Sequence, residues 1–178
     1  MKNYKKNLEL LTKNFVYSKE MEHDACGVGL IASTEGKKSR AIVEHGIEAL
    51  KAVWHRGAVD ADGKTGDGAG IHVEIPKDFF IEKIQVTGHD YDSSEICVGM
   101  IFLPRNDYSA QENCKTIVES ELTKNNFSIY GWRQVPVNPK VLGEKALQTM
   151  PEIIQVLFKS NDPNLLDKNL ERKIYEIR

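Results

Sequence analysis

Short apolar runs alternate with amphipathic segments along this sequence, and this alternation limits the fold more than any other feature. The runs predict strands over residues 26–33, 71–75, 96–103, 127–137 and 152–158. Several of these runs are apolar on both faces, which is typical of strands in a sheet that is covered on both sides. The sequence therefore favours the α/β or α+β class.

Helical patterns lie between the predicted strands. Val43, Ile47, Leu50 and Trp54 recur at spacings of three and four residues, which indicates a helix over residues 39–54. A helical turn is predicted over residues 78–84, and a longer helix over residues 108–124, with inward positions at Cys114, Ile117, Val118 and Leu122. Residues 164–178 are amphipathic or mixed. Residues 1–20 are polar and predict a short helix or an arm, with a boundary near residue 22.

Composition excludes several classes of protein. The chain has 178 residues and a net charge of −2, which argues against nucleic-acid binding through bulk positive charge. No apolar run approaches the ~20 residues that span a bilayer, so no membrane segment is predicted. The three cysteines lack CxxC spacing, which excludes a disulfide framework and a zinc ribbon. The histidines show no metal-ligand spacing either. We expect a cytoplasmic protein with reduced thiols and no metal site.

Cys26 opens the first predicted strand and is the strongest candidate for chemistry. Gly27 and Gly29 follow it and permit close approach of another group to the backbone. A buried packing cysteine is the ordinary interpretation of such a position. If the Ala25–Cys26 bond were cut, Cys26 would carry a free α-amino group, whose pKa near ~8 suits a base close to neutral pH. One residue would then supply both nucleophile and base.

The motif His55-Arg56-Gly57-Ala58 follows the predicted helix. Basic residues are favoured at helix C-termini by the helix dipole, and this is the structural interpretation of the motif. The functional alternative places the Arg56 guanidinium beside the Cys26 strand, where it would favour the reactive thiolate. Arg56 is therefore a candidate for a supporting role.

A glycine-rich segment, GAVDADGKTGDGAG, covers residues 57–70 and predicts a loop. Its alternating glycines suggest a phosphate cradle, but no GKS or GKT follows, and the loop is expected to enter a strand. Phosphate cradles need a helix N-terminus instead. A tight entry into the strand is therefore the better interpretation than nucleotide binding.

Together, these motifs resemble the class II glutamine amidotransferase domain, an N-terminal-nucleophile hydrolase. The resemblance begins with DACGVG (24–29), HRGA (55–58) and DGAGI (67–71). Longer segments are similar to the large subunits of glutamate synthases in particular, namely VGMIFLP (98–104), YGWRQVPV (130–137) and LGEKALQTMPEIIQVLF (142–158). The combination is specific, whereas each motif alone is weak.

This resemblance implies an α+β fold, the four-layer αββα sandwich. It implies that residues 1–25 are a propeptide and that residues 26–178 are the N-terminal part of the amidotransferase domain. Cys26 would attack the side-chain amide of L-glutamine, and its own α-amino group would act through a water as the base. A γ-glutamyl thioester would form and ammonia would leave, after which water would release glutamate.

In the family, the ammonia passes to a downstream synthase site that converts 2-oxoglutarate to glutamate. The resemblance implies FMN and an iron–sulfur cluster in those downstream domains and no cofactor within this chain. The implied partners are the synthase domains and an electron donor. That donor is either ferredoxin or a small electron-transfer subunit that uses a nicotinamide cofactor.

Two departures from the family pattern indicate that part of the site lies elsewhere. The family's oxyanion hole comes from an Asn-Gly pair, and no Asn-Gly dipeptide occurs in this sequence. The groups that hold the α-carboxylate and α-amine of glutamine also come later in relatives. We therefore expect this chain to be an N-terminal piece of a larger enzyme and to be inactive alone.

Three alternatives stay open. The chain could be a catalytically incompetent remnant that serves at most as a folding or interaction module. It could belong to another amidotransferase of the superfamily, such as one that makes phosphoribosylamine or asparagine, although VGMIFLP and GWRQVPV argue against that. A nucleotide-binding module would need a phosphate-binding helix, which the sequence does not predict.

Overall fold

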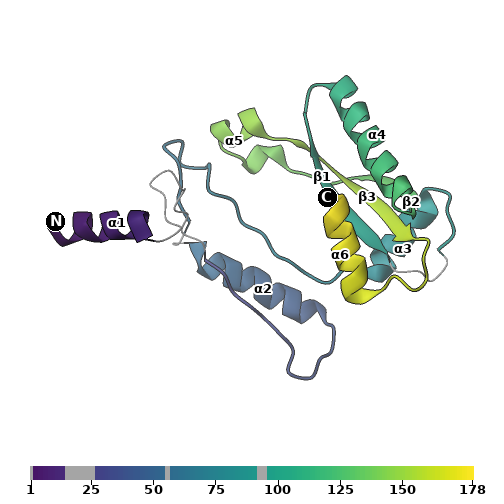
Figure 1. Cartoon of the computed structure of the whole chain (residues 1–178), viewed down its shortest axis with the longest axis horizontal. Coiled ribbons are helices and arrows are strands. Elements are labelled where there is room, and N and C mark those ends of the chain that lie inside the picture. The colour runs from purple at the N-terminus through teal and green to yellow at the C-terminus, as the bar shows by residue number, and fades with distance from the viewer. Residues whose placement is uncertain (1, 15–26, 55–56, 92–95) are drawn as a thin grey trace. The chain divides into compact units, whose positions relative to one another are not determined.

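The computed structural model describes residues 2–14, 27–54, 57–91 and 96–178. The chain divides into two compact units, of which the first contains Met1–Ala58 and Asp67–Ile71 and the second contains Val59–Gly66 and His72–Arg178. The first unit carries helices α1 (Lys2–Asn14) and α2 (Arg40–Ala52), and the second carries the sheet and the remaining helices (Figure 1).

The sheet of the second unit has three antiparallel strands in the order β1-β3-β2. They are β1 (Cys97–Leu103), β2 (Phe127–Gln134) and β3 (Glu152–Ser160). Helix α4 (Tyr108–Lys124) connects β1 to β2, and its first turn is capped by the Asp107 carboxylate, which accepts from the Ala110 N–H at 2.9 Å. Because β3 pairs with both neighbours, the last strand in sequence lies at the centre of the sheet.

Each face of the sheet has its own core. On one face, Val156 and Phe158 of β3 pack with Leu122 of α4 and with Leu170 of α6 (Asp167–Ile177). On the other face, Leu157 packs with the aromatic and aliphatic side chains of α3 (Lys77–Val86), chiefly Phe80 and Ile84. The alternation of β3 residues between the two cores explains why this strand is apolar on both faces.

A β-bulge in β2 leaves room for the C-terminal end of α3 to pack closely against the sheet. The register with β3 shifts between Ile129 and Gly131, and Gly131 has a φ of 147°, which favours glycine. A Cβ on Gly131 would lie 2.9 Å from Cγ2 of Thr87, the residue that follows α3. The Thr87 hydroxyl lies within hydrogen-bond distance of two carbonyls, that of Ile84 at 2.7 Å and that of Tyr130 at 2.8 Å.

The structure confirms most of the predicted elements. Helix α2 and helix α4 occur where the spacing of apolar residues indicates them, and α4 has the predicted bounds. Strands β1, β2 and β3 match three of the predicted strands, although β2 ends at Gln134 rather than at residue 137. The helical turn near residue 80 is longer than predicted, and the ambiguous segment after residue 164 contains α6.

Two predicted strands are wrong. Residues 27–33 have no regular structure and are largely exposed, with Val28 at 92% and Leu30 at 90%. Residues 71–75 also lack strand structure. A strand needs a partner for its backbone groups, and no described residue pairs with either segment. The inward position predicted for Ile117 is also wrong, because this side chain is 62% exposed.

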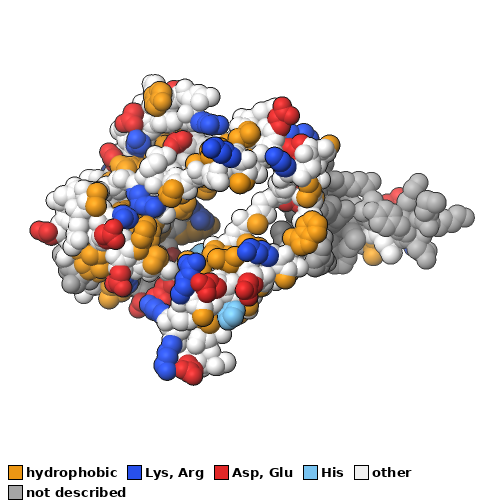
Figure 2. All heavy atoms as spheres, turned by 180° about the vertical axis from the view of Figure 1, so that it is seen from behind, with side chains coloured by type: hydrophobic (Ala, Val, Ile, Leu, Met, Phe, Trp, Pro, Cys, Tyr) orange, Lys and Arg blue, Asp and Glu red, His pale blue; other side chains and the backbone are white. Residues whose placement is uncertain are grey.

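The sheet is covered less completely than the apolar pattern predicts. Met100 and Phe102 of β1 are 47% and 63% exposed, although β1 belongs to the sheet. Hydrophobic side chains are accordingly visible at the surface among the charged ones (Figure 2). No helix among the described residues is long and apolar enough to cross a bilayer.

Candidate active site

The two residues predicted to carry chemistry, Cys26 and Arg56, lie outside the residues that the structure describes. His55 lies outside them as well. The structure describes the glycine-rich segment that follows Arg56. Residues 59–66 of this segment belong to the second unit. The described part of the candidate site is the glycine-rich segment after Arg56, together with the contacts that fix it.

Residues 59–66 form a short hairpin. An antiparallel bridge joins Val59 to Gly66, and inside it the Asp60 N–H donates to the Thr65 carbonyl at 2.7 Å. The turn closes with a bond from the Gly63 N–H to the Asp60 carbonyl at 2.9 Å. Gly63 has a φ of 70°, in the left-handed region where glycine is favoured. The predicted loop is thus an ordered turn.

Asp62 organises the tip of this hairpin. Its carboxylate accepts from the Thr65 hydroxyl, from the Thr65 N–H at 2.7 Å and from the Lys64 N–H at 2.9 Å. These hydrogen bonds, first that of the Thr65 hydroxyl, hold the pKa of the Asp62 carboxyl well below its usual range, and the N–H of Lys145 contributes in the same direction. Asp62 is therefore an anion under all ordinary conditions.

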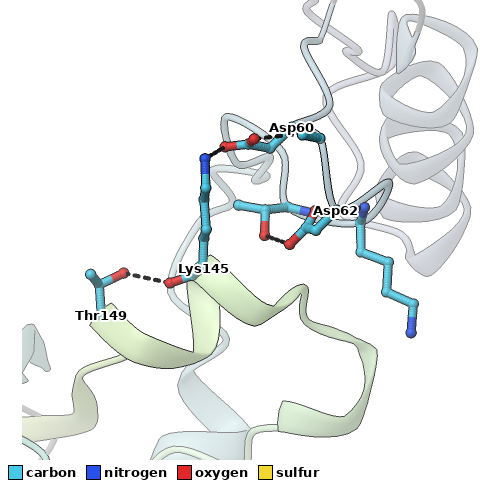
Figure 3. A network of polar contacts seen from close by, with 7 residues as sticks. Asp60, Asp62, Lys145 and Thr149 are labelled. Atoms are coloured by element: carbon cyan, nitrogen blue, oxygen red, sulfur yellow. Dashed lines mark hydrogen bonds and ion pairs between the residues drawn. The ribbon is translucent and has the colours of Figure 1, made fainter.

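Helix α5 (Glu144–Thr149) contacts the tip of the hairpin, as Figure 3 shows. The Lys145 ammonium lies 2.6 Å from the Asp60 carboxylate, and the labelled side chains of Asp60 and Lys145 point toward each other. Gly143, which precedes α5, is buried against the hairpin, and a Cβ there would collide with the Thr65 hydroxyl and the Asp62 carboxylate. A glycine is required here by close approach.

A second aspartate acts within the first unit. The Asp67 carboxylate accepts from the Ala58 N–H at 3.0 Å. Ala58 and Asp67 both belong to the first unit, and this bond joins them across the base of the hairpin. Asp67 lies in the DGAGI motif, so one of the motif's residues has a structural role that the sequence pattern alone did not assign.

The other two cysteines have ordinary packing environments. Cys97 is 5% exposed and lies in the core beside Phe158 and Val156, whereas Cys114 is half-buried on α4. Neither of them forms a disulfide. No group of three or more His, Cys, Asp or Glu that could hold a metal ion occurs among the described residues.

Sequence reasoning missed Lys145 and the role of Asp62. A signal for Asp62 was available, since an aspartate in a glycine-rich loop commonly forms an Asx turn by accepting from the N–H two residues on, as Asp62 does from Lys64. No local signal marks Lys145, because its partner lies 85 residues away in sequence.

Comparison with known proteins defines the family. The family model for class-II glutamine amidotransferases matches residues 26–178, so the chain belongs to the class-II glutamine amidotransferases. The family assignment agrees with the α and β content and with the three-stranded antiparallel sheet. It also confirms the resemblance that the motifs around Cys26 and Arg56 indicated.

Three similar proteins are glutamate synthases. The chain is 53% identical over 175 residues to the NADPH glutamate synthase large chain of Azospirillum brasilense. It is 39% identical over 158 residues to ferredoxin-dependent glutamate synthase 1 of Arabidopsis thaliana, and 35% identical over 176 residues to the NADH glutamate synthase of Saccharomyces cerevisiae. These matches cover 98%, 88% and 93% of this chain but only 12%, 10% and 8% of those proteins.

Proposed function

We propose that this chain is the N-terminal part of the glutaminase domain of a glutamate synthase. The observation that carries the proposal is the 53% identity over 98% of the chain to a glutamate synthase large chain. The activity is the hydrolysis of L-glutamine to glutamate and ammonia. The ammonia is passed to a synthase site that makes a second glutamate from 2-oxoglutarate.

Cys26 is the proposed nucleophile, and processing at the Ala25–Cys26 bond gives it a free α-amino group. The thiolate attacks the amide carbon of the glutamine side chain. The carbon–nitrogen bond breaks, ammonia leaves with a proton delivered through the α-amino group, and a γ-glutamyl thioester remains. Water, deprotonated by the same amine, then attacks the thioester, releases glutamate and restores the thiol. Arg56 supports the reaction by favouring the thiolate.

The proposed domain organisation follows the same resemblance. Residues 1–25 are a propeptide, and residues 26–178 belong to a four-layer αββα sandwich whose remaining strands lie outside this chain. The half-covered sheet, with Phe102 exposed by 63%, supports that arrangement. The exposed apolar residues of the segment after Cys26 support it as well, since such residues are usually buried when their partner is present.

The redox chemistry is assigned to parts of the enzyme outside this chain. An iron–sulfur cluster takes cysteine thiolates as ligands, and the described residues offer no group of three or more metal-ligating side chains. FMN and the cluster would supply the reducing equivalents for the synthase step. The relatives named above include NADPH-, NADH- and ferredoxin-dependent enzymes, so both kinds of electron donor stay candidates.

The alternative is a catalytically incompetent fragment that serves as a folding or interaction module. The two proposals are separated by the mature N-terminus of the enzyme that carries this chain. Intact-mass or Edman analysis should find Cys26 at the N-terminus of the active enzyme. Retention of Met1 or Lys2 in fully active enzyme would exclude the proposed processing and the role of the α-amino group as base.

A further inference from the structure

We propose that β1 pairs with a further strand along its outer edge, and that the stretch of chain directly after Arg178 in the longer protein supplies this strand. The new strand would run antiparallel to β1 and extend the sheet to four strands. The inference rests on the proposed function in one respect, that this chain is the N-terminal part of a longer protein, since it makes up only 12% of the Azospirillum brasilense large chain. The topology of the sheet, its two edges and the end of α6 carry the argument.

The topology of the second unit is that of a split β-α-β arrangement with one strand fewer. Along the chain, β1, α4, β2, β3 and α6 follow one another, with two short helices in the connection between β2 and β3. Both β1 and β2 are antiparallel to β3, so they are parallel to each other, and β3 lies between them. In the complete β-α-β-β-α-β motif a further strand follows the second helix. The order of elements therefore predicts a strand as the next element after α6.

The positions of the two long helices decide at which edge that strand joins. Leu122 of α4 and Leu170 of α6 pack in the same core, so both helices cover the same face of the sheet. Helical connections between parallel strands of one sheet are right-handed in nearly all proteins. The connection through α4 starts at β1 and crosses toward β2. The connection through α6 starts at β3, which points the opposite way, so on the same face it is right-handed only if it crosses toward β1. The new strand would then lie beside β1 and parallel to β3.

The two edges of the sheet differ in the same sense. Strand β1 has the sequence CVGMIFL, without a charged residue or a proline, and it pairs with β3 at all seven positions without a bulge. Charged residues, prolines and bulges are the features that protect an edge strand from pairing with further strands. On the β2 edge, the bulge between Ile129 and Gly131 and the Thr87 hydroxyl, 2.8 Å from the Tyr130 carbonyl, provide such protection. Addition of a strand is therefore favoured at β1 and hindered at β2.

Helix α6 ends close to the β1 side of the sheet. Ile174 and Ile177 of its last turn pack against the core that contains Cys97, and Ile101 of β1 packs against the same core. The C-terminus accordingly lies near β1 (Figure 1). Connections between a helix and the next strand are commonly about two to six residues long. The chain after Arg178 can therefore reach the edge of β1 through a short connection.

Exposed side chains on β1 indicate the chemistry of the new strand. Met100 and Phe102 lie on the face of β1 opposite to Ile101, and they are 47% and 63% exposed. Directly opposite side chains of an antiparallel pair lie about 5 Å apart. We therefore expect a strand about as long as β1, which has seven residues, with apolar side chains beside Met100 and Phe102.

The first experiment measures amide hydrogen exchange by mass spectrometry in the 178-residue chain and in the full-length enzyme. Every second N–H of an edge strand points away from its partner strand. Within residues 97–103, these N–H groups should exchange quickly in the 178-residue chain and at least roughly tenfold more slowly in the full-length enzyme. Residues 153–158 of β3, which pair on both sides, are the internal control and should exchange slowly in both.

The second experiment identifies the strand by photo-crosslinking in the full-length enzyme. Phe102→benzoylphenylalanine should form crosslinks that peptide mass spectrometry locates within about 20 residues after Arg178, the length of a short connection and a strand. Ile117→benzoylphenylalanine is the matched control, because Ile117 is 62% exposed but lies on α4. The control should form no crosslink to that segment.

The outcomes separate this inference from the proposed function. Fast exchange at residues 97–103 in an active full-length enzyme, or crosslinks from position 102 only to other segments, would overturn the inference alone. Slow exchange in the 178-residue chain that depends on its concentration would show that a second copy occupies the edge, and would overturn it as well. Protection of β1 in an enzyme without glutaminase activity would overturn the proposed function and leave the inference in place. A protein that ends at Arg178 would overturn both.

Discussion

Cys26 is the residue on which the proposed chemistry depends. Cys26→Ser should abolish nearly all glutaminase turnover of the full-length enzyme, because a hydroxyl is a far weaker nucleophile than a thiolate at neutral pH. Cys97→Ala and Cys114→Ala should keep the activity, since Cys97 lies in the core of the sheet and Cys114 lies half-buried on α4. An electrophilic glutamine analogue, followed by peptide mass spectrometry, should label Cys26 alone. Labelling at Cys97 or Cys114 instead would refute the assignment.

Asp62 should give the hairpin a distinctive response to acid. Because its folded pKa is lowered, the carboxylate stabilises the hairpin fully above the unfolded pKa of about 3.9, and this contribution is lost as the pH falls toward the lowered folded value. The Thr65 amide signal in an NMR titration should therefore shift with a midpoint well below 3.9. Asp62→Asn should remove this inflection. A wild-type midpoint at the ordinary aspartate value would contradict the clamp.

The sequence and the structure reveal different residues of this site. Cys26 and Arg56 are candidates from the sequence alone, because each lies in a compact motif with flanking glycines, and their roles stay predictions. Lys145 is not predictable, since its partner Asp60 is distant in sequence and an exposed lysine on a short helix is ordinary. Only the fold brings the two charges together at 2.6 Å.

At the scale of elements, the central strand should carry most of the stability of the sheet. Leu157→Ala removes a side chain with 0% exposure and should lower the free energy of unfolding by about 3 kcal/mol. Phe102→Ala truncates a larger side chain that is 63% exposed and should change it by less than about 0.5 kcal/mol. Urea unfolding of the 178-residue chain measures both. Equal losses would show that Phe102 is buried in solution.

The sequence predicts a helix or strand correctly where its apolar side chains and backbone groups find partners among the described residues. Helix α4 has its predicted bounds because an Asp107 cap begins it and its apolar side chains reach the sheet. The segments 27–33 and 71–75 have equally apolar patterns but no strand partner among the described residues. An apolar run predicts that its side chains are buried. Whether the run forms a strand depends on which other segments are present to pair with its backbone.

At the scale of the whole molecule, we expect residues 26–178 alone to show no measurable glutaminase activity. The sequence has no Asn-Gly pair, which the family resemblance places in the oxyanion hole, and loss of one oxyanion donor costs about 10²–10³ in rate. The family resemblance also places the groups that hold the glutamine α-carboxylate and α-amine later than residue 178. Ammonia release from glutamine by residues 26–178 measures this directly. Turnover comparable to the complete domain would mean that Arg56 or residues 63–70 supply the oxyanion contacts.

The central place of β3 has a consequence for how the chain folds on the ribosome. Among the described strands, β1 and β2 each pair with β3 alone, so neither of these pairings can be completed until residue 160 has been synthesised. Roughly 60 residues separate the end of β1 from that point, which at ~5–20 residues per second is a delay of about 3 to 12 seconds. During this interval the apolar β1 lacks the strand with which it pairs in the folded sheet, so its backbone groups and apolar side chains stay exposed until β3 emerges.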